Sequence, residues 1–150
     1  MLPFRTVVFP TDFSAPAETA LGAAVELARH FQSALHLVHV VPALPATTSD
    51  PNFTFSVPEY EALLHAEARD KLEQLATGLR GEGLSCDWSI GNGNAGREIV
   101  RIAGEHGADL IVIATHGETG WRHVIFGSVA ERVVQHAPCP VLTIRSSDQA

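Results

Sequence analysis

Long apolar segments and an excess of basic residues are both missing from this 150-residue sequence. No run approaches the roughly 18 apolar residues of a transmembrane helix, so we expect no membrane span. Ten Lys and Arg residues stand against 17 Asp and Glu, and the net charge of -7 argues against a sequence-independent nucleic-acid binder. A single anionic ligand is still compatible with this charge, because a local group of backbone N–H groups can outweigh it.

Cysteine is scarce as well. Cys86 and Cys139 are far apart in the sequence, and neither belongs to a Cys-x-x-Cys pair. We therefore expect two reduced, buried thiols in a reducing compartment. The amino end shows no basic region followed by a long apolar segment, as a secretion signal would have. These absences together predict a cytoplasmic protein.

Several familiar site motifs are also absent. The chain contains neither the Gly-x-Gly-x-x-Gly dinucleotide fingerprint nor the Gly-Lys-Ser/Thr of a P-loop. Gly127-Ser128-Val129 is not a Gly-x-Ser-x-Gly nucleophile elbow, and no cysteine has an obvious local base. No His-x-x-x-His or Glu-x-x-His pair is present, which argues against a metal site and leaves His116 as the histidine to test.

What is present is the composition of one globular domain over residues 1–150, with 45% hydrophobic and 18% charged residues. Apolar periodicities predict strands that alternate with helices, and therefore an α/β domain with a mainly parallel sheet. The expected strands cover residues 5–10, 34–41, 85–90, 110–113 and 140–145. The expected helices run from Ser14 to about Phe31, from Pro58 to Gly81, from Asn94 to about Gly107, and onward from Ser128. Residues 42–58 are predicted as a surface loop, the third strand as a sheet edge because it is less apolar, and 146–150 as a frayed tail.

The stretch from Leu110 to Ser128 organises the rest of the prediction. A β-branched run ends in Ala114-Thr115-His116-Gly117, nine residues follow, and Gly127-Ser128 then opens a helix. Glycines let the backbone approach a ligand, and the N–H groups and dipole of a helix start favour an anion. This pattern indicates a phosphate site, although a plain strand–loop–helix connection with glycines in tight turns would look the same.

A second candidate lies after the first strand, at Pro10-Thr11-Asp12. An acidic side chain there can accept hydrogen bonds from ribose hydroxyl groups, as in other doubly wound folds. It can equally well satisfy N–H groups of its own turn. His39, near the end of the second strand, is expected close to a nucleotide base.

Three segments of the chain resemble the universal stress protein family over residues 4–145. They are Val-Val-Phe-Pro-Thr-Asp-Phe-Ser, Leu-Val-His-Val-Val, and Ala-Asp-Leu-Ile-Val-Ile-Ala-Thr-His-Gly followed by Gly-Ser-Val-Ala-Glu-Arg-Val-Val and Ala-Pro-Cys-Pro-Val-Leu. The resemblance implies a single-domain Rossmann-like sandwich similar to adenine nucleotide α-hydrolases. It also implies a five-stranded parallel sheet in the order 3-2-1-4-5, helices on both faces, and a homodimer through the last strand, at Val141, Leu142, Thr143 and Ile144.

The family contains ATP-binding members, which carry Gly-x-x-Gly-x9-Gly-Ser/Thr, and members without nucleotide. Gly117, Gly127 and Ser128 match this motif, but Ala114 replaces its first glycine. Alanine costs roughly 1 kcal/mol if that position needs a positive φ, and nothing if it only needs to be small. The resemblance implies an ATP site, with Mg²⁺, formed by Pro10, Thr11, Asp12, Val40, Ile113, Ala114, His116, Gly117, Gly127, Ser128 and Val129.

Three functions follow as hypotheses. The first is an ATP-binding regulatory dimer with slow or no hydrolysis, because no general base is evident and Arg122 is the only cation between Gly117 and Ser128. The second is a dimeric stress or signalling module without nucleotide, suggested by Ala114. The third is an enzyme of the α-hydrolase group that adenylylates a substrate.

Overall fold

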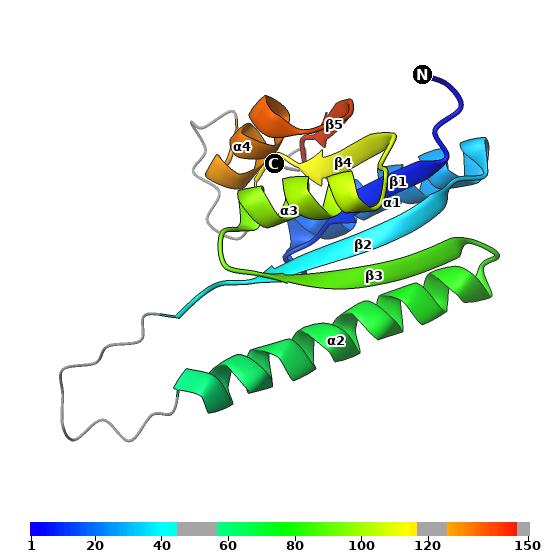
Figure 1. Cartoon of the computed structure of the whole chain (residues 1–150). Helices are drawn as coiled ribbons and strands as arrows, with labels where there is room; N and C mark the ends of the chain where they lie inside the picture. The colour runs from blue at the N-terminus through cyan, green and yellow to red at the C-terminus, as the bar shows by residue number, and fades with distance from the viewer. Residues whose placement is uncertain (45–56, 117–125, 147–150) are drawn as a thin grey trace, which may run out of the picture.

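The computed structural model describes residues 1–44, 57–116 and 126–146, and strands and helices alternate along these ranges (Figure 1). The elements are β1 (Thr6–Pro10), α1 (Ala15–Phe31), β2 (Ala34–Val41), α2 (Val57–Gly81), β3 (Ser85–Asn92), α3 (Ala95–Glu105), β4 (Leu110–Ala114), α4 (Ser128–His136) and β5 (Val141–Ile144). All neighbouring strands pair in parallel, in the order β3-β2-β1-β4-β5. The predicted five-stranded sheet, its strand order and the edge position of β3 are therefore confirmed.

The sheet is buried on both faces because its central strands are apolar at nearly every position. Side chains alternate between the faces, so Val7 and Phe9 pack with α1 and α2, whereas Val8 packs with α3 and α4. Figure 1 shows the same arrangement, with the sheet between the two helical layers. These two apolar layers fix the strands, and the ends of the strands then position the candidate site.

Local sequence signals set two helix starts as expected. The Ser14 hydroxyl accepts a hydrogen bond from Ala17 N at the start of α1, and Asn94 Oδ1 accepts one from Arg97 N at the start of α3. One boundary differs from the prediction. β3 continues to Asn92, through residues expected to form a turn, because Gly91 and Asn92 pair with Val40 and Val41 of β2.

Parts of two predicted segments, residues 45–56 of the loop and 147–150 of the tail, lie outside the described residues. Among the helices that the structure describes, none combines the length and the apolar character needed to span a bilayer.

Candidate functional site

The strand order reverses between β1 and β4, and at the carboxyl ends of these strands lies a hollow of about 340 Å³. Pro10, Thr11 and Asp12 line it after β1, together with Val40 of β2. Ile113, Ala114 and His116 line it at the end of β4, and Gly127, Ser128 and Val129 at the start of α4. The structure thus brings the described candidate residues to one hollow. Gly117, the remaining candidate, lies outside the described residues.

The turn after β1 holds Asp12 in a defined orientation. Its Oδ1 accepts hydrogen bonds from the backbone N–H of Ser14, at 3.0 Å, and from the Ser14 hydroxyl. The two roles predicted for Asp12, acceptor for its own turn and acceptor for a ribose hydroxyl, are therefore compatible. Oδ1 satisfies the turn, while Oδ2 accepts no hydrogen bond from the described residues. Because Ser14 also caps α1, the helix start and the carboxylate are fixed by the same side chain.

Phe13, which sequence reasoning missed, stabilises this turn in an unusual conformation. Its φ of 62° lies in the left-handed region, which is uncommon for a bulky residue and is frequent near functional sites. The Phe13 ring packs on the His39 ring with centroids 4.7 Å apart, and Lys71 Nζ lies 5.1 Å from the Phe13 centroid. His39 Nδ1 is 2.8 Å from the Thr11 carbonyl oxygen. Ring packing and this contact hold the turn against β2.

The start of α4 forms the opposite wall. Gly127 is the N-cap, and as a glycine it supplies no side-chain oxygen to cap the helix. Gly127 N donates to Thr115 O at 2.7 Å, and a Cβ at Gly127 would lie 3.2 Å from the same oxygen. The close approach explains the glycine. The first turn of α4 therefore lines the hollow without a capping side chain from its own N-cap residue, and a helix start of this kind favours an anion.

Ala114 is the last residue of β4 and pairs with Ile144 of β5. The non-glycine residues with positive φ in the described ranges are Phe13 and Gln32, so Ala114 needs no conformation reserved for glycine. The alanine at the first motif position therefore introduces no backbone strain. It adds one methyl group to the wall of the hollow.

Two further wall residues were also missed. Ala95 and Ile99 reach the hollow from the first turns of α3, one helical turn apart. A spacing of four residues is typical of one helix face, but it does not indicate which end of the sheet that face reaches. The described lining residues include no Lys or Arg, so the attraction for an anion comes there from backbone N–H groups and the α4 dipole.

Comparison with known proteins places this geometry in a family. The profile of the universal stress protein family matches residues 3–145. A universal stress protein of Methanocaldococcus jannaschii is 30% identical over 142 residues, covering 95% of this chain and 82% of the relative. The UspA structure from Lactobacillus plantarum is similar with a TM-score of 0.81 and 28% identity, over 97% of this chain and 100% of that one.

A universal stress protein from Archaeoglobus fulgidus, solved in complex with dAMP, is 27% identical, with a TM-score of 0.66 over 96% of this chain and 99% of that one. Sequence profile, full-length relatives and strand order agree with one another. The chain belongs to the universal stress protein family.

Proposed function

We propose that this protein binds ATP, together with Mg²⁺, in the hollow between β1 and α4, and acts as a nucleotide-dependent regulator in a stress response. The observation that carries the proposal is the α4 start, whose N-cap is a glycine without a capping side chain and which lies in one hollow with the oriented Asp12 carboxylate. Its volume, about 340 Å³, lies within the range of small-molecule sites. The dAMP complex of the A. fulgidus relative supports an adenine nucleotide as the ligand class.

The residues present fit such a ligand. Asp12 Oδ2 is available for a ribose hydroxyl, while Pro10, Thr11 and Val40 offer a largely apolar wall for the base. The amides of Ser128 and Val129, with the Ser128 hydroxyl, would hold phosphates, while Gly127, whose N–H is bonded to Thr115 O, lets the helix start come close to them. A side chain at Gly127 would crowd Thr115 O, so the glycine lets the start of α4 lie close to the end of β4. Ile113, Ala114 and His116 complete the wall at β4.

Mg²⁺ would be held chiefly through the phosphates. Among the described residues, no three His, Cys, Asp or Glu side chains are grouped to hold a metal ion. Slow or absent hydrolysis is part of the proposal, because a fast ATPase needs a group that positions and activates water. The nearest candidate, His116, has its Nδ1 3.0 Å from Thr115 Oγ1, which occupies one ring nitrogen.

The direct test is isothermal titration of the purified protein with ATP and Mg²⁺, alongside mass spectrometry of nucleotide released on denaturation. We expect binding near one nucleotide per chain, weakened about 10-fold or more in Asp12→Asn, which keeps the size of the side chain but removes its charge. No heat signal at millimolar ATP and no released nucleotide would favour the nucleotide-free module instead. ATP–pyrophosphate exchange above background would favour the adenylylating enzyme.

We also propose a homodimer through β5. This strand is at the sheet edge, and of its residues Val141, Leu142, Thr143 and Ile144 none is fully buried. Leu142 is 39% exposed, and soluble proteins usually protect an apolar edge of this kind. Light scattering at micromolar concentration should give a dimer that Leu142→Lys converts to a monomer. Leu63→Lys, at a 53% exposed leucine on α2, is the matched control and should stay dimeric.

A cytoplasmic location completes the proposal. Cys86 and Cys139 are both free thiols, which suits a reducing compartment. Burial raises the pKa of the Cys86 thiol to about 11. The reactive thiolate form is therefore scarce at neutral pH, and the residue resists oxidation.

A further inference from the structure

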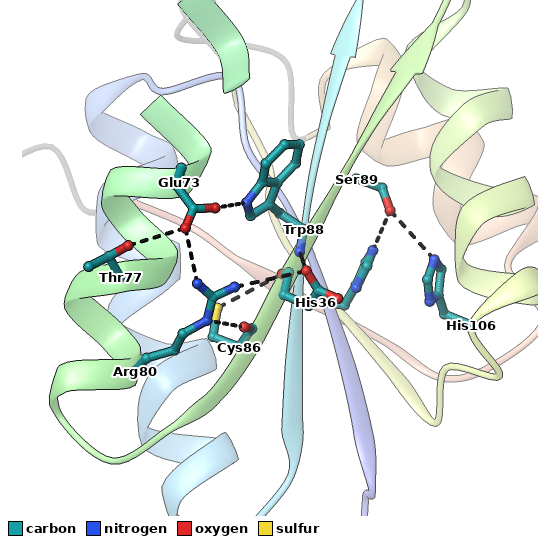
Figure 2. Close-up of polar contacts among 9 residues, drawn as sticks. His36, Glu73, Thr77, Arg80, Cys86, Trp88, Ser89 and His106 are labelled. Carbon is teal, nitrogen blue, oxygen red and sulfur yellow. Dashed lines mark hydrogen bonds and ion pairs between the residues drawn. The ribbon is translucent and has the colours of Figure 1, made fainter. Parts of the chain in front are cut away.

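A second polar cluster lies away from the proposed nucleotide site, between the neighbouring strands β2 and β3 and the end of α3. His36 of β2 pairs in register with Asp87 of β3, and Ser89, two residues along β3, points to the same face. His106 follows the last residue of α3 and closes over His36 from the helix side (Figure 2). None of these residues lines the proposed nucleotide site.

The two imidazoles are stacked on one another and share one hydroxyl. Their centroids are 3.8 Å apart, with 28° between the ring planes. Ser89 Oγ is 2.7 Å from His36 Nε2 and 3.5 Å from His106 Nε2, as Figure 2 shows. When the hydroxyl donates to one ring, that ring must present an unprotonated Nε2. The hydroxyl can donate to one ring and accept from the other, so the arrangement accommodates two neutral imidazoles of suitable tautomers.

This geometry does not suit a metal ion. A ligating imidazole directs its lone pair in the ring plane, and nearly parallel rings direct two lone pairs side by side instead of toward one point. No third His, Cys, Asp or Glu in the described ranges completes a metal-binding group here. The cluster is instead arranged to respond to protons.

The surrounding charges would not neutralise a doubly protonated pair. From β3, Asp87 favours the charged form of His36, but its carboxylate also accepts from Trp88 N, and its side chain is 80% exposed. From α2, Arg80 lines the same hollow as the pair. From α3, Glu105 is paired with Arg101. Cys86 and, from β1, Thr6 add no charge at neutral pH.

We propose that the stacked His36–His106 pair is an acid-sensitive latch that holds the end of α3 against β2 and β3, and that protonation of the buried His36 ring releases this end. His36 is only 6% exposed, so a charge on it is poorly solvated unless the ring leaves its place. A second charge on His106, at 3.8 Å, adds like-charge repulsion. This inference concerns the protein without ligand and does not depend on the proposed function.

The direction and size of the effect follow from linkage. Burial in the first place, and His106 in the second, lower the pKa of His36 from 6.5 to about 4. The open state therefore binds the proton more tightly than the closed state, and acid favours opening as the pH falls from 6.5 to 4. With these values, opening is about 30-fold more favourable at pH 5 than at neutral pH.

Hydrogen exchange of the ligand-free protein, read by mass spectrometry and corrected for intrinsic rates, tests this latch. Between pH 7.5 and pH 5, the protection factors of α3 should fall about 30-fold, to below those of α1. In the double variant His36→Gln/His106→Gln, which cannot take up these protons, the fall should disappear. His30→Gln, at an exposed histidine of α1, is the matched control and should keep it.

If the double variant does not fold, His106→Gln alone serves, with ring NMR titration as the readout. Removing the neighbouring charge should raise the pKa of His36 and reduce the fall in α3 protection. The proposal is overturned if the fall persists unchanged in the folded variant, or if α3 and α1 are equally protected at pH 5. Neither result depends on whether the protein binds ATP.

Discussion

The polar groups at the two ends of the sheet differ in whether they have hydrogen-bond partners within the protein. At the amino end, the Asp109 carboxylate accepts from the backbone N–H groups of Arg5 and Thr6 at 2.8 and 2.9 Å, and Ser33 Oγ donates to Phe4 O. At the carboxyl end, the N-cap of α4 is a glycine without a capping side chain, and Asp12 uses one oxygen in its turn. The amino end is closed by internal partners, whereas the carboxyl end keeps donors and acceptors for a ligand.

The contrast separates stability from binding. Internal hydrogen bonds contribute modestly to stability, but removing one partner leaves the other unsatisfied. Open groups at the carboxyl end contribute nothing until a ligand arrives. Substituting an open polar group at the carboxyl end should therefore change affinity more than stability, and substituting a paired polar group at the amino end should do the reverse.

The largest effect on ATP affinity is expected from a substitution at the start of α4. Gly127→Val places a branched side chain against Thr115 O, which even a Cβ would approach to 3.2 Å. We expect a loss of ATP affinity of about 100-fold or more, roughly 2.7 kcal/mol, measured by titration calorimetry. Gly104→Val is the control, because a Cβ there meets nothing within 4 Å. Unchanged affinity in Gly127→Val would place the phosphates elsewhere.

Two glycines on α3 test how closely this helix packs at its two ends. A Cβ at Gly96 would lie 2.7 Å from Arg132 Cδ and 2.9 Å from its Cβ, so Gly96→Ala forces α3 and α4 apart. We expect a loss of about 1–3 kcal/mol in the free energy of unfolding, measured in urea. Gly104→Ala should instead gain up to about 1 kcal/mol from helix propensity. Equal effects at the two positions would show that the helix contact is loose.

Acid should weaken the amino end. His36 titrates at about 4 in the folded protein, below its ordinary 6.5, so its contribution is complete above pH 6.5 and lost as the pH falls toward 4. The free energy of unfolding should decrease by about 2 kcal/mol from pH 7.5 to pH 5 through this group. Urea titrations at both pH values measure it. A variant with His36→Gln that shows the same decrease would assign the loss to other groups.

The smallest effect is expected at Ala114. Because this residue lies in β4 without a positive φ, Ala114→Gly relieves no strain and should change ATP affinity by less than about threefold. Titration calorimetry with ATP on the original protein and on Ala114→Gly measures this difference in affinity. A gain of tenfold or more in the glycine variant would mean that the methyl group itself obstructs the ligand.

Sequence patterns predicted the elements well where local chemistry decides them. Ser14 and Asn94 cap their helices as expected, and the apolar runs became the five strands. The extension of β3 through Gly91 was missed because pairing with β2 overrides the turn preference of glycine. Local signals fail where a distant partner determines the structure.

The candidate site shows the same division. The residues around Asp12 and Gly127 were found because each follows a strand or opens a helix, whereas Ile99 was not, since its place depends on how α3 lies across the sheet. The stacking of His36 on His106 joins residues from two distant segments. Neither segment alone contains a pattern that predicts this contact.

Helix α3 connects the two ends, since Ala95 lines the ligand hollow and His106 follows its last residue. If proton uptake at one end shifts the helix and lowers nucleotide affinity at the other, reciprocity requires that bound nucleotide hinder proton uptake by the same factor. Nucleotide supply would then set the acidity at which the helix is released. Nucleotide concentration and pH would then act on the protein as one combined signal.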